Sequence, residues 1–323
     1  MRNHDTRSIT PLTPCADRTE HCRTELTRPD LDRHFGQYMD RCPPPRPSQA
    51  RRTHRQQGIA AMSLTDHAAS SIVDTSPGHG QVRTALEAFW ARAELSKLEA
   101  KFAVAREMDA LPRLSVQALR AIALQYRYFT QAFVTDLARL VVRCPEGRFR
   151  SLLGQLVDEE LGHGDPEAAH LRLYDRFLES IGAIAPDATS EELCTRVHPR
   201  VRELLSELRD RTINRSTFYA IGMRGMGGEC VCGVYFSVMH VHLRKHPFII
   251  ANEATIDWRF WDIHAGHADV EHNALVRAAV AELLVDGNHP DAVSEVAAGY
   301  DHGTATWDEF WTTVYGDHLV RPA

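Results

Sequence analysis

Apolar residues recur at three- and four-residue spacing along most of the chain from about residue 81, which is the period of amphipathic α-helices. The clearest stretch is residues 115–143, SVQALRAIALQYRYFTQAFVTDLARLVVR, and the Pro- and Gly-containing break at 144–147 ends it. No run of alternating apolar and polar residues is long enough to indicate a β-strand. The pattern therefore predicts an all-α bundle of about seven or eight helices.

Start and stop signals divide this helical region. Pro112 ends the first part, and Gly162-His163-Gly164 interrupts the helix expected over residues 147–162. Asp165-Pro166 is expected to restart a helix, with Asp165 as N-cap and Pro166 in the first turn. Thr189 and Glu192 form a capping-box pattern ahead of a polar helix.

Further helices are expected over residues 253–287 and 306–319. Between them and the polar helix, residues 216–243 carry several glycines, which lower helix propensity but let neighbouring backbones approach closely. Pro247 stops this segment.

The N-terminal 61 residues differ from the rest in charge and composition. They contain eleven Arg, no Lys, seven acidic residues and seven of the sixteen Pro, and they show no apolar periodicity. Such a segment buries too little apolar area to offset its backbone entropy, so we expect residues 1–78 to be a disordered tail and residues 79–323 to be one helical domain. Met62 is an alternative start of the native chain, and an Arg-rich targeting arm is the alternative interpretation of the tail.

Charge and cysteine usage exclude several classes of protein. The net charge of −6 argues against binding of nucleic acid through a strong global field, and no apolar run approaches the ~20 residues of a membrane span. The start of the chain has no apolar signal-peptide region. The seven Cys show neither a CxxC motif nor the spacing of a disulfide framework, so they say little about disulfides, and we expect reduced thiols in a cytoplasmic protein.

Histidines and carboxylates gather in two places that predict a metal site. Glu167 and His170 form one [DE]-x-x-H pair, and Asp269 and His272 form another. In a helix, a three-residue step leaves both side chains on one side, where they can bind one metal ion. Two such pairs on separate helices are typical of a carboxylate-bridged di-iron or di-manganese bundle, and ligands of this kind suit Fe(II).

Two further carboxylates extend this prediction. Glu229 lies among small and apolar residues in GMRGMGGECVCGVYF, where an isolated charge is costly to bury. A metal ligand explains Glu229, and a buried salt bridge is the alternative. Glu160 is an additional carboxylate near the first pair.

The second cluster has an irregular spacing, because His264 and Asp269 are five residues apart and do not share a face of a regular helix. A π-bulge would bring them together, and we favour this interpretation. Alternatively, His264, His267 and Glu271 line one regular face, so that His267 or Glu271 replaces a ligand.

Taken as a set, these residues resemble the haem-oxygenase-like di-iron oxidases and oxygenases, over roughly residues 115–285. That family has E-x-x-H on one helix, matched by Glu167 and His170, and a lone Glu on another, matched by Glu229. Its third motif, H-x-x-x-D-x-x-H, is matched by His264, Asp269 and His272 with one extra residue. The resemblance implies a haem-oxygenase-like helical fold and these six side chains as ligands.

The resemblance also implies two Fe(II) ions, O₂ as co-substrate, and a small amine- or amino-acid-derived substrate in specialised metabolism. It admits an external electron donor and a homodimer. The reaction would be N-oxygenation or oxidative C–C cleavage. N-oxygenating members have a further carboxylate on an earlier helix, and Asp136 is the candidate for it here, with an ordinary solvated helix residue as the alternative.

Two other functions stay open at this stage. A thiaminase-like hydrolase of the same fold would use Cys230 or Cys232 as nucleophile. A non-enzymatic helical protein that binds a metal or a ligand is the other.

Overall fold

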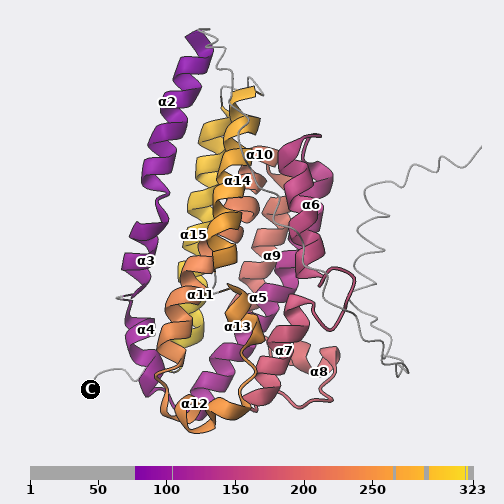
Figure 1. Cartoon of the computed structure of the whole chain (residues 1–323), viewed down its shortest axis with the longest axis vertical. Helices are drawn as coiled ribbons and strands as arrows, with labels where there is room; N and C mark the ends of the chain where they lie inside the picture. Colours follow the sequence, from indigo (N-terminus) through magenta and orange to yellow (C-terminus); the bar gives the residue numbers. More distant parts are fainter. Residues whose placement is uncertain (1–76, 104, 265–266, 287–290, 317, 319–323) are drawn as a thin grey trace, which may run out of the picture. The chain divides into compact units, whose positions relative to one another are not determined.

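The computed structural model describes most of the helical region predicted from the sequence, namely residues 77–103, 105–264, 267–286, 291–316 and 318. These residues belong to one compact unit, residues 67–323. Every regular element in these ranges is a helix and none is a strand (Figure 1), which confirms the all-α prediction. The N-terminal tail predicted to be disordered, residues 1–78, lies almost entirely outside the described residues. Its last two residues, 77 and 78, are described and begin the first helix.

The described α-helices differ widely in length, from four to 28 residues. Up to residue 180 they are α2 (Pro77–Arg92), α3 (Leu95–Ala103), α4 (Arg106–Ala110), the 3₁₀ turn η1 (Leu111–Arg113), α5 (Val116–Arg143), α6 (Arg148–Glu160) and α7 (His170–Ser180). After it they are α8 (Ser190–Thr195), α9 (Pro199–Asn214), α10 (Thr217–Ala220), the π-helical turn η2 (Ile221–Met226), α11 (Glu229–Leu243), α12 (Pro247–Asn252), the 3₁₀ turn η3 (Glu253–Thr255), α13 (Arg259–His264), α14 (His267–Asp286) and α15 (Ala292–Gly316).

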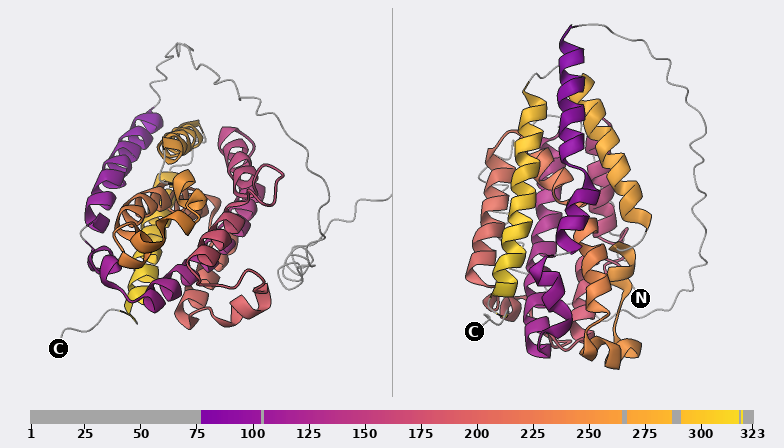
Figure 2. Two further views of the ribbon diagram at one scale, coloured as in Figure 1. Left: turned by 60° about the horizontal axis from the view of Figure 1, so that its bottom comes forward. Right: turned by 90° about the vertical axis from the view of Figure 1, so that its left-hand side faces the viewer.

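Helix α5 lies at the centre of the packing and contacts α6, α7, α9 and η2. Its sequence signals act as expected: the Ser115 hydroxyl accepts a hydrogen bond from the amide of Ala118 at 3.1 Å, and the helix ends before Cys144. Buried residues follow one another along most of its length, so α5 is surrounded by other helices. Helix α5 also contacts the yellow helix α15, and Figure 2 shows the bundle from two further sides.

The glycines of the segment after α9 allow close helix packing. A Cβ atom at Gly222 would lie 2.0 Å from the carbonyl oxygen of Val296, and one at Gly299 would lie 2.0 Å from that of Tyr219. Only glycine lets α10 and η2 approach α15 to this distance. The predicted close approach of backbones is therefore confirmed here.

Three expected helices are divided in the structure. The first helical region breaks between α2 and α3, and the polar helix breaks between α8 and α9, where Pro199 has no amide hydrogen to continue α8 and instead starts α9. The helix expected over 253–287 becomes η3, α13 and α14. The π-helical turn of the structure lies at residues 221–226. The π-bulge predicted between His264 and Asp269 falls on residues 265–266, which are outside the described residues, so it stays a prediction.

Among the described residues, no helix combines the length and the apolar composition that a bilayer crossing requires.

Candidate metal centre

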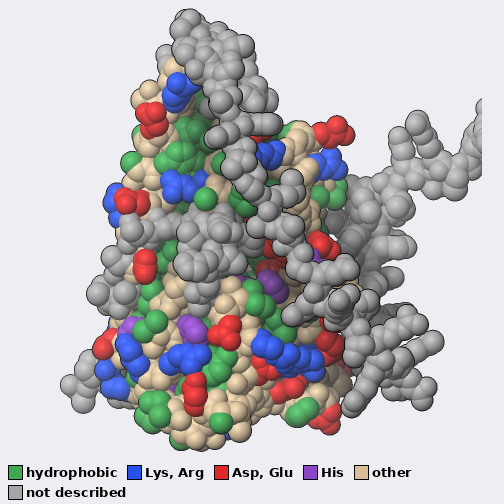
Figure 3. All heavy atoms as spheres, in the orientation of Figure 1, with side chains coloured by type: hydrophobic (Ala, Val, Ile, Leu, Met, Phe, Trp, Pro, Cys, Tyr) green, Lys and Arg blue, Asp and Glu red, His purple; other side chains and the backbone are tan. Residues whose placement is uncertain are grey.

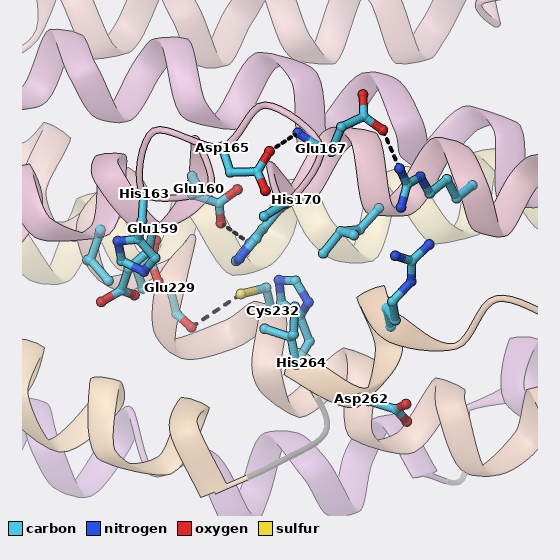
Figure 4. Close-up of a pocket in the computed structure, with 17 residues that line it drawn as sticks. Glu159, Glu160, His163, Asp165, Glu167, His170, Glu229, Cys232, Asp262 and His264 are labelled. Carbon is cyan, nitrogen blue, oxygen red and sulfur yellow. Dashed lines mark hydrogen bonds and ion pairs between the residues drawn. The ribbon is translucent and has the colours of Figure 1, made fainter. Parts of the chain in front are cut away.

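Three metal-binding side chains meet at the ends of three helices. Glu160 is the last residue of α6, His170 is the first of α7 and His264 is the last of α13. One ligand atom from each lies within 4.8 Å of the others. Nδ1 of His170 is 3.1 Å from Oε1 of Glu160, and the two histidine rings are 4.8 Å apart between centroids in an edge-to-face arrangement (Figure 4). We call these three residues the Glu–His–His triad.

The loop between α6 and α7 brings Glu160 and His170 together. Gly162, His163 and Gly164 have φ values of +80°, +52° and +84°, so the chain reverses direction through left-handed conformations. A Cβ atom at Gly162 would lie 2.3 Å from the carbonyl oxygen of Asp165, which only glycine avoids. The sequence signal for an interruption at these residues therefore marks the turn on which the triad depends.

The orientation of His264 suits a metal ligand. Its Nδ1 lies 2.8 Å from the carbonyl oxygen of Phe260, one turn earlier in α13. A carbonyl only accepts hydrogen bonds, so in the neutral ring Nδ1 carries the hydrogen and Nε2 carries the lone pair that binds a metal. The ring is 7% exposed and packs against the rings of Phe236 and Phe260, which hold its plane.

The triad opens into a cleft of about 920 Å³. Glu229, the first residue of α11, lines this cleft together with the triad, as Glu159 and Cys232 also do (Figure 4). The remaining lining residues come mainly from the α6–α7 loop, α7 and α13: Leu156, Gly162, His163, Asp165, Glu167, Ala168, Leu173, Arg176, Arg259, Asp262 and Ile263. The predicted ligands His170, Glu229 and His264 thus share one cavity.

The buried oxygen of Glu160 tests whether the site fits a cation. Its Oε2 atom is buried and has no hydrogen-bond partner among the described side chains. Leaving such an atom without a partner costs about 1–3 kcal/mol, and more for a charged group. A cation beside His170 and His264 would satisfy it. A donor set of carboxylate oxygen and imidazole nitrogen, without thiolate, suits iron better than structural zinc.

Glu167 does not lie where the sequence pattern placed it. Helix α7 begins at His170, so Glu167 stands in the turn before it and the two residues share no helix face. Its carboxylate binds the Arg176 guanidinium and approaches Arg172 at 3.5 Å, and its side chain is 58% exposed. The carboxylate beside His170 is instead that of Glu160, which the sequence analysis named only as an additional carboxylate.

Asp136 is also placed away from the triad. Its side chain is fully buried in α5, with Oδ2 accepting a hydrogen bond from Arg224 at 2.6 Å and Oδ1 one from Arg139 at 3.2 Å. Both oxygens are engaged by guanidinium groups, and Asp136 does not line the cleft. The expectations of a metal ligand and of a solvated helix residue are both wrong, because the residue forms a buried ion pair.

The remaining predicted ligands lie on α14. Asp269 and His272, and the alternatives His267 and Glu271, fall where the backbone is helical but the side chains are outside the described residues. Their participation stays a prediction.

The cysteines proposed as alternative nucleophiles differ in position. Cys230 is 4% exposed and does not line the cleft, and burial, assisted by the charge of Glu229, raises the pKa of its thiol. Cys232 lines the cleft, and its thiol donates a hydrogen bond to the carbonyl of Glu229 at 3.3 Å. Burial thus disfavours the thiolate that a Cys230 nucleophile would need.

Arg176 and Arg259 are charged cleft residues that sequence reasoning missed. Arg176 follows His170 by six residues on α7, and Arg259 precedes His264 by five on α13. Arginines are common on helices, so nothing in the sequence indicated that these two line the same cleft as the triad.

Comparisons with known proteins identify the fold and the family. Two crystal structures of a CADD-like protein of unknown function from Nostoc punctiforme, at 2.00 and 1.35 Å resolution, share the fold, with TM-scores of 0.53 and 0.52. Each is 16% identical, and each alignment covers 76% of this chain and all of that one. No curated protein matches the chain in sequence. The model of one family, described as iron-containing redox enzymes, matches residues 120–307. Because that range includes most of the described helices and the whole triad, the chain belongs to the iron-containing redox enzyme family.

Proposed function

We propose that this protein is a non-haem di-iron enzyme that activates O₂ to oxidise a small amine- or amino-acid-derived metabolite. The observation that carries the proposal is the Glu–His–His triad, which opens into a cleft also lined by Glu229. Membership of an iron-containing redox family supports iron as the metal.

The residues of the site divide into two sets. One iron ion would be held by the Glu–His–His triad. Glu229 lines the same cavity and would contribute a further carboxylate. Asp269 and His272 are the predicted ligands that would complete a site for a second ion. When bound, a pair of ferrous ions would supply the electrons that reduce O₂.

The chain's own residues prepare the site for this chemistry. The hydrogen bond from His264 to Phe260 fixes the ring so that Nε2 keeps its lone pair. On the buried side of Glu160 and His264 lies a small cavity of about 20 Å³, walled mainly by the rings of Phe129, Phe133 and other aromatic residues. This space has the size of one water molecule, and its apolar lining favours an uncharged diatomic molecule such as O₂.

Tyr126 borders the same small cavity and is fully buried. Burial raises the pKa of its hydroxyl well above the ordinary value, and the Cys232 thiol acts in the same direction. Tyr126 therefore keeps its proton well above neutral pH, so a protonated tyrosine borders the cavity that Glu160 also lines.

The choice between N-oxygenation and C–C cleavage is open in this proposal. Asp136 was the only residue that favoured N-oxygenation, and its engagement by Arg224 and Arg139 removes that support.

Anaerobic titration with Fe(II), followed by mixing with O₂, tests the proposal. We expect close to two iron ions per chain and a transient visible absorption after mixing. Glu160→Ala should lose iron, whereas Glu167→Ala, a matched change in the exposed ion pair, should keep it. Absence of iron binding would contradict the proposal and favour a non-enzymatic helical protein that binds another ligand. Equal loss of iron in both variants would contradict the assigned metal site.

A further inference from the structure

The cleft has two chemically different ends. At one end, the rings of His170 and His264 are 4.8 Å apart. Helices α7 and α13 pack against each other, and both continue from this point along the cleft. Arg176 on α7 and Arg259 on α13 line the same cavity further along. In Figure 3, which has the orientation of Figure 1, basic side chains gather over α7 with acidic ones beside them.

The two arginines lie at one end of the cleft because the helices are antiparallel there. Arg176 lies six residues after His170, which is about 9 Å of helix rise, and Arg259 lies five residues before His264, which is about 7.5 Å. The charge of Arg176 helps to lower the pKa of Asp257, which binds Arg259. The charge of Glu167, which binds Arg176, helps to raise the pKa of Arg259. The four groups therefore form one cluster, which we call the arginine end.

Apolar side chains line the wall between the two ends, together with one acidic residue, Asp262. Leu173 lies midway between His170 and Arg176 on α7, and Ile263 lies between Arg259 and His264 on α13. Both line the cleft. A ligand that extends from the arginine end to the triad would thus pass along apolar side chains.

We propose that the substrate carries a carboxylate that binds Arg176 and Arg259, and that an apolar chain places its reacting atom at the triad, about 8 Å of helix rise away. The inference rests on the proposed function, since it identifies the substrate class of that same site. A guanidinium group binds a carboxylate through two parallel hydrogen bonds, so the pair gives both affinity and direction.

Glu167 supports this assignment, because it is a carboxylate already bound to Arg176. Its side chain is 58% exposed, and exposed ion pairs of this kind contribute little to stability. A substrate carboxylate can therefore replace Glu167 at low cost. Asp257 binds Arg259 through both carboxylate oxygens, with Nε 2.9 Å from Oδ1 and Nη2 bound to Oδ2. A substrate carboxylate would therefore use the end of the guanidinium formed by Nη1 and Nη2.

The acidic residues near this end do not compete with a carboxylate in the same way. Asp262 lines the cleft but projects from a different side of α13 than His264, and Oδ1 of Asp165 accepts a hydrogen bond from the amide of Glu167 at 2.9 Å (Figure 4). Glu159, Glu160 and Glu229 lie with the histidines at the metal end. Bound iron would offset their charge.

Binding of octanoate to the full-length chain, as purified and after removal of metal by chelation, tests the proposal by calorimetry. Octanoate should bind both forms, and Arg176→Gln or Arg259→Gln should weaken binding at least tenfold. Glu167→Gln should tighten it severalfold, because the competing carboxylate is gone. Methyl octanoate, which lacks the charge, should bind equally weakly to all variants.

Arg172→Gln is the matched control, since Arg172 is on the same helix and 3.5 Å from Glu167 but does not line the cleft. It should change octanoate binding less than twofold, and circular dichroism should show that every variant is folded. Wild-type binding that is absent, or unchanged in Arg176→Gln, would overturn the proposal.

The metal-free arm separates this inference from the proposed function. If the protein takes up no iron but octanoate binding still depends on Arg176 and Arg259, the proposed function is contradicted and the carboxylate site is supported. If the protein takes up iron and reacts with O₂ but octanoate binding does not depend on the two arginines, the proposed function is supported and the carboxylate site is contradicted.

Discussion

The Nδ1 atom of His170 lies 3.1 Å from the Oε1 atom of Glu160, although ten residues separate them in sequence. The contact depends on a loop with three consecutive left-handed residues, and it joins the end of α6 to the start of α7. With His264 from α13, it places a buried carboxylate and two imidazoles where one cation can bind all three.

Gly162→Ala should separate Glu160 from His170. The added Cβ meets the carbonyl of Asp165 at 2.3 Å, and the residue has a φ of +80°, so the loop must move. We expect iron affinity to fall at least tenfold while the helical content is kept, measured by anaerobic Fe(II) titration and circular dichroism.

Gly154→Ala in α6 is the control for this change. A Cβ atom there meets nothing within 4 Å, so iron binding should be unchanged and stability should rise by about 0.5–1 kcal/mol. Equal iron binding in the two variants would show that the loop does not set the triad.

Asp136→Asn should destabilise the fold and leave the metal site intact. The change leaves Arg224, which is 1% exposed, without its charged partner, and breaking a buried ion pair costs about 3–5 kcal/mol. Urea denaturation should show this loss, and iron stoichiometry should equal that of the wild type. Asp109→Asn, in the exposed pair with Arg113, should have no measurable effect on stability. Loss of iron in Asp136→Asn would restore Asp136 as a ligand.

The packing of η2 on α15 should not tolerate a methyl group. Gly222→Ala places a Cβ atom 2.0 Å from the carbonyl of Val296, and overpacking of this kind costs about 1–3 kcal/mol or more. Thermal unfolding should shift to lower temperature. Gly80→Ala in α2, where a Cβ atom meets nothing within 4 Å, should not lower the transition. An unchanged transition in Gly222→Ala would mean that the two helices are further apart.

Cysteine alkylation should depend on burial and on pH. Burial raises the pKa of Cys144 to about 12, so its thiolate fraction at pH 8 is roughly one part in ten thousand, against about a quarter for an ordinary thiol. Native Cys144 should react slowly, with a rate that rises about tenfold per pH unit, while exposed Cys194 reacts readily. Cys230 should behave like Cys144. Peptide mass spectrometry after timed iodoacetamide treatment measures these rates, and rapid labelling of Cys230 at pH 7 would revive it as a nucleophile.

The features predicted correctly from sequence depend on local signals. The Ser115 cap, the end of α5 before Cys144 and the Thr189–Glu192 capping box each involve residues a few positions apart, and the structure contains all three. Glu229 was identified as a candidate because a charged residue is unusual among small and apolar neighbours, and His264 because it belongs to a cluster of histidines and carboxylates. The structure brings both to the cleft.

The errors arise where tertiary contacts decide. The spacing of Glu167 and His170 fits a helix, but the left-handed turn at residues 162–164 delays α7 until His170 and gives Glu160 the position beside the ring. Arg176 then binds Glu167 across the turn. The buried partner of Asp136, Arg224, lies 88 residues away, and no local pattern could indicate it.

Anomalous diffraction at the iron edge, from crystals grown anaerobically with Fe(II), tests the central claim most directly. The account predicts a strong peak bonded to Glu160, His170 and His264, and a second one nearby in the same cleft. A peak bonded to Glu167 instead of Glu160, or no peak beside the two histidines, would contradict it.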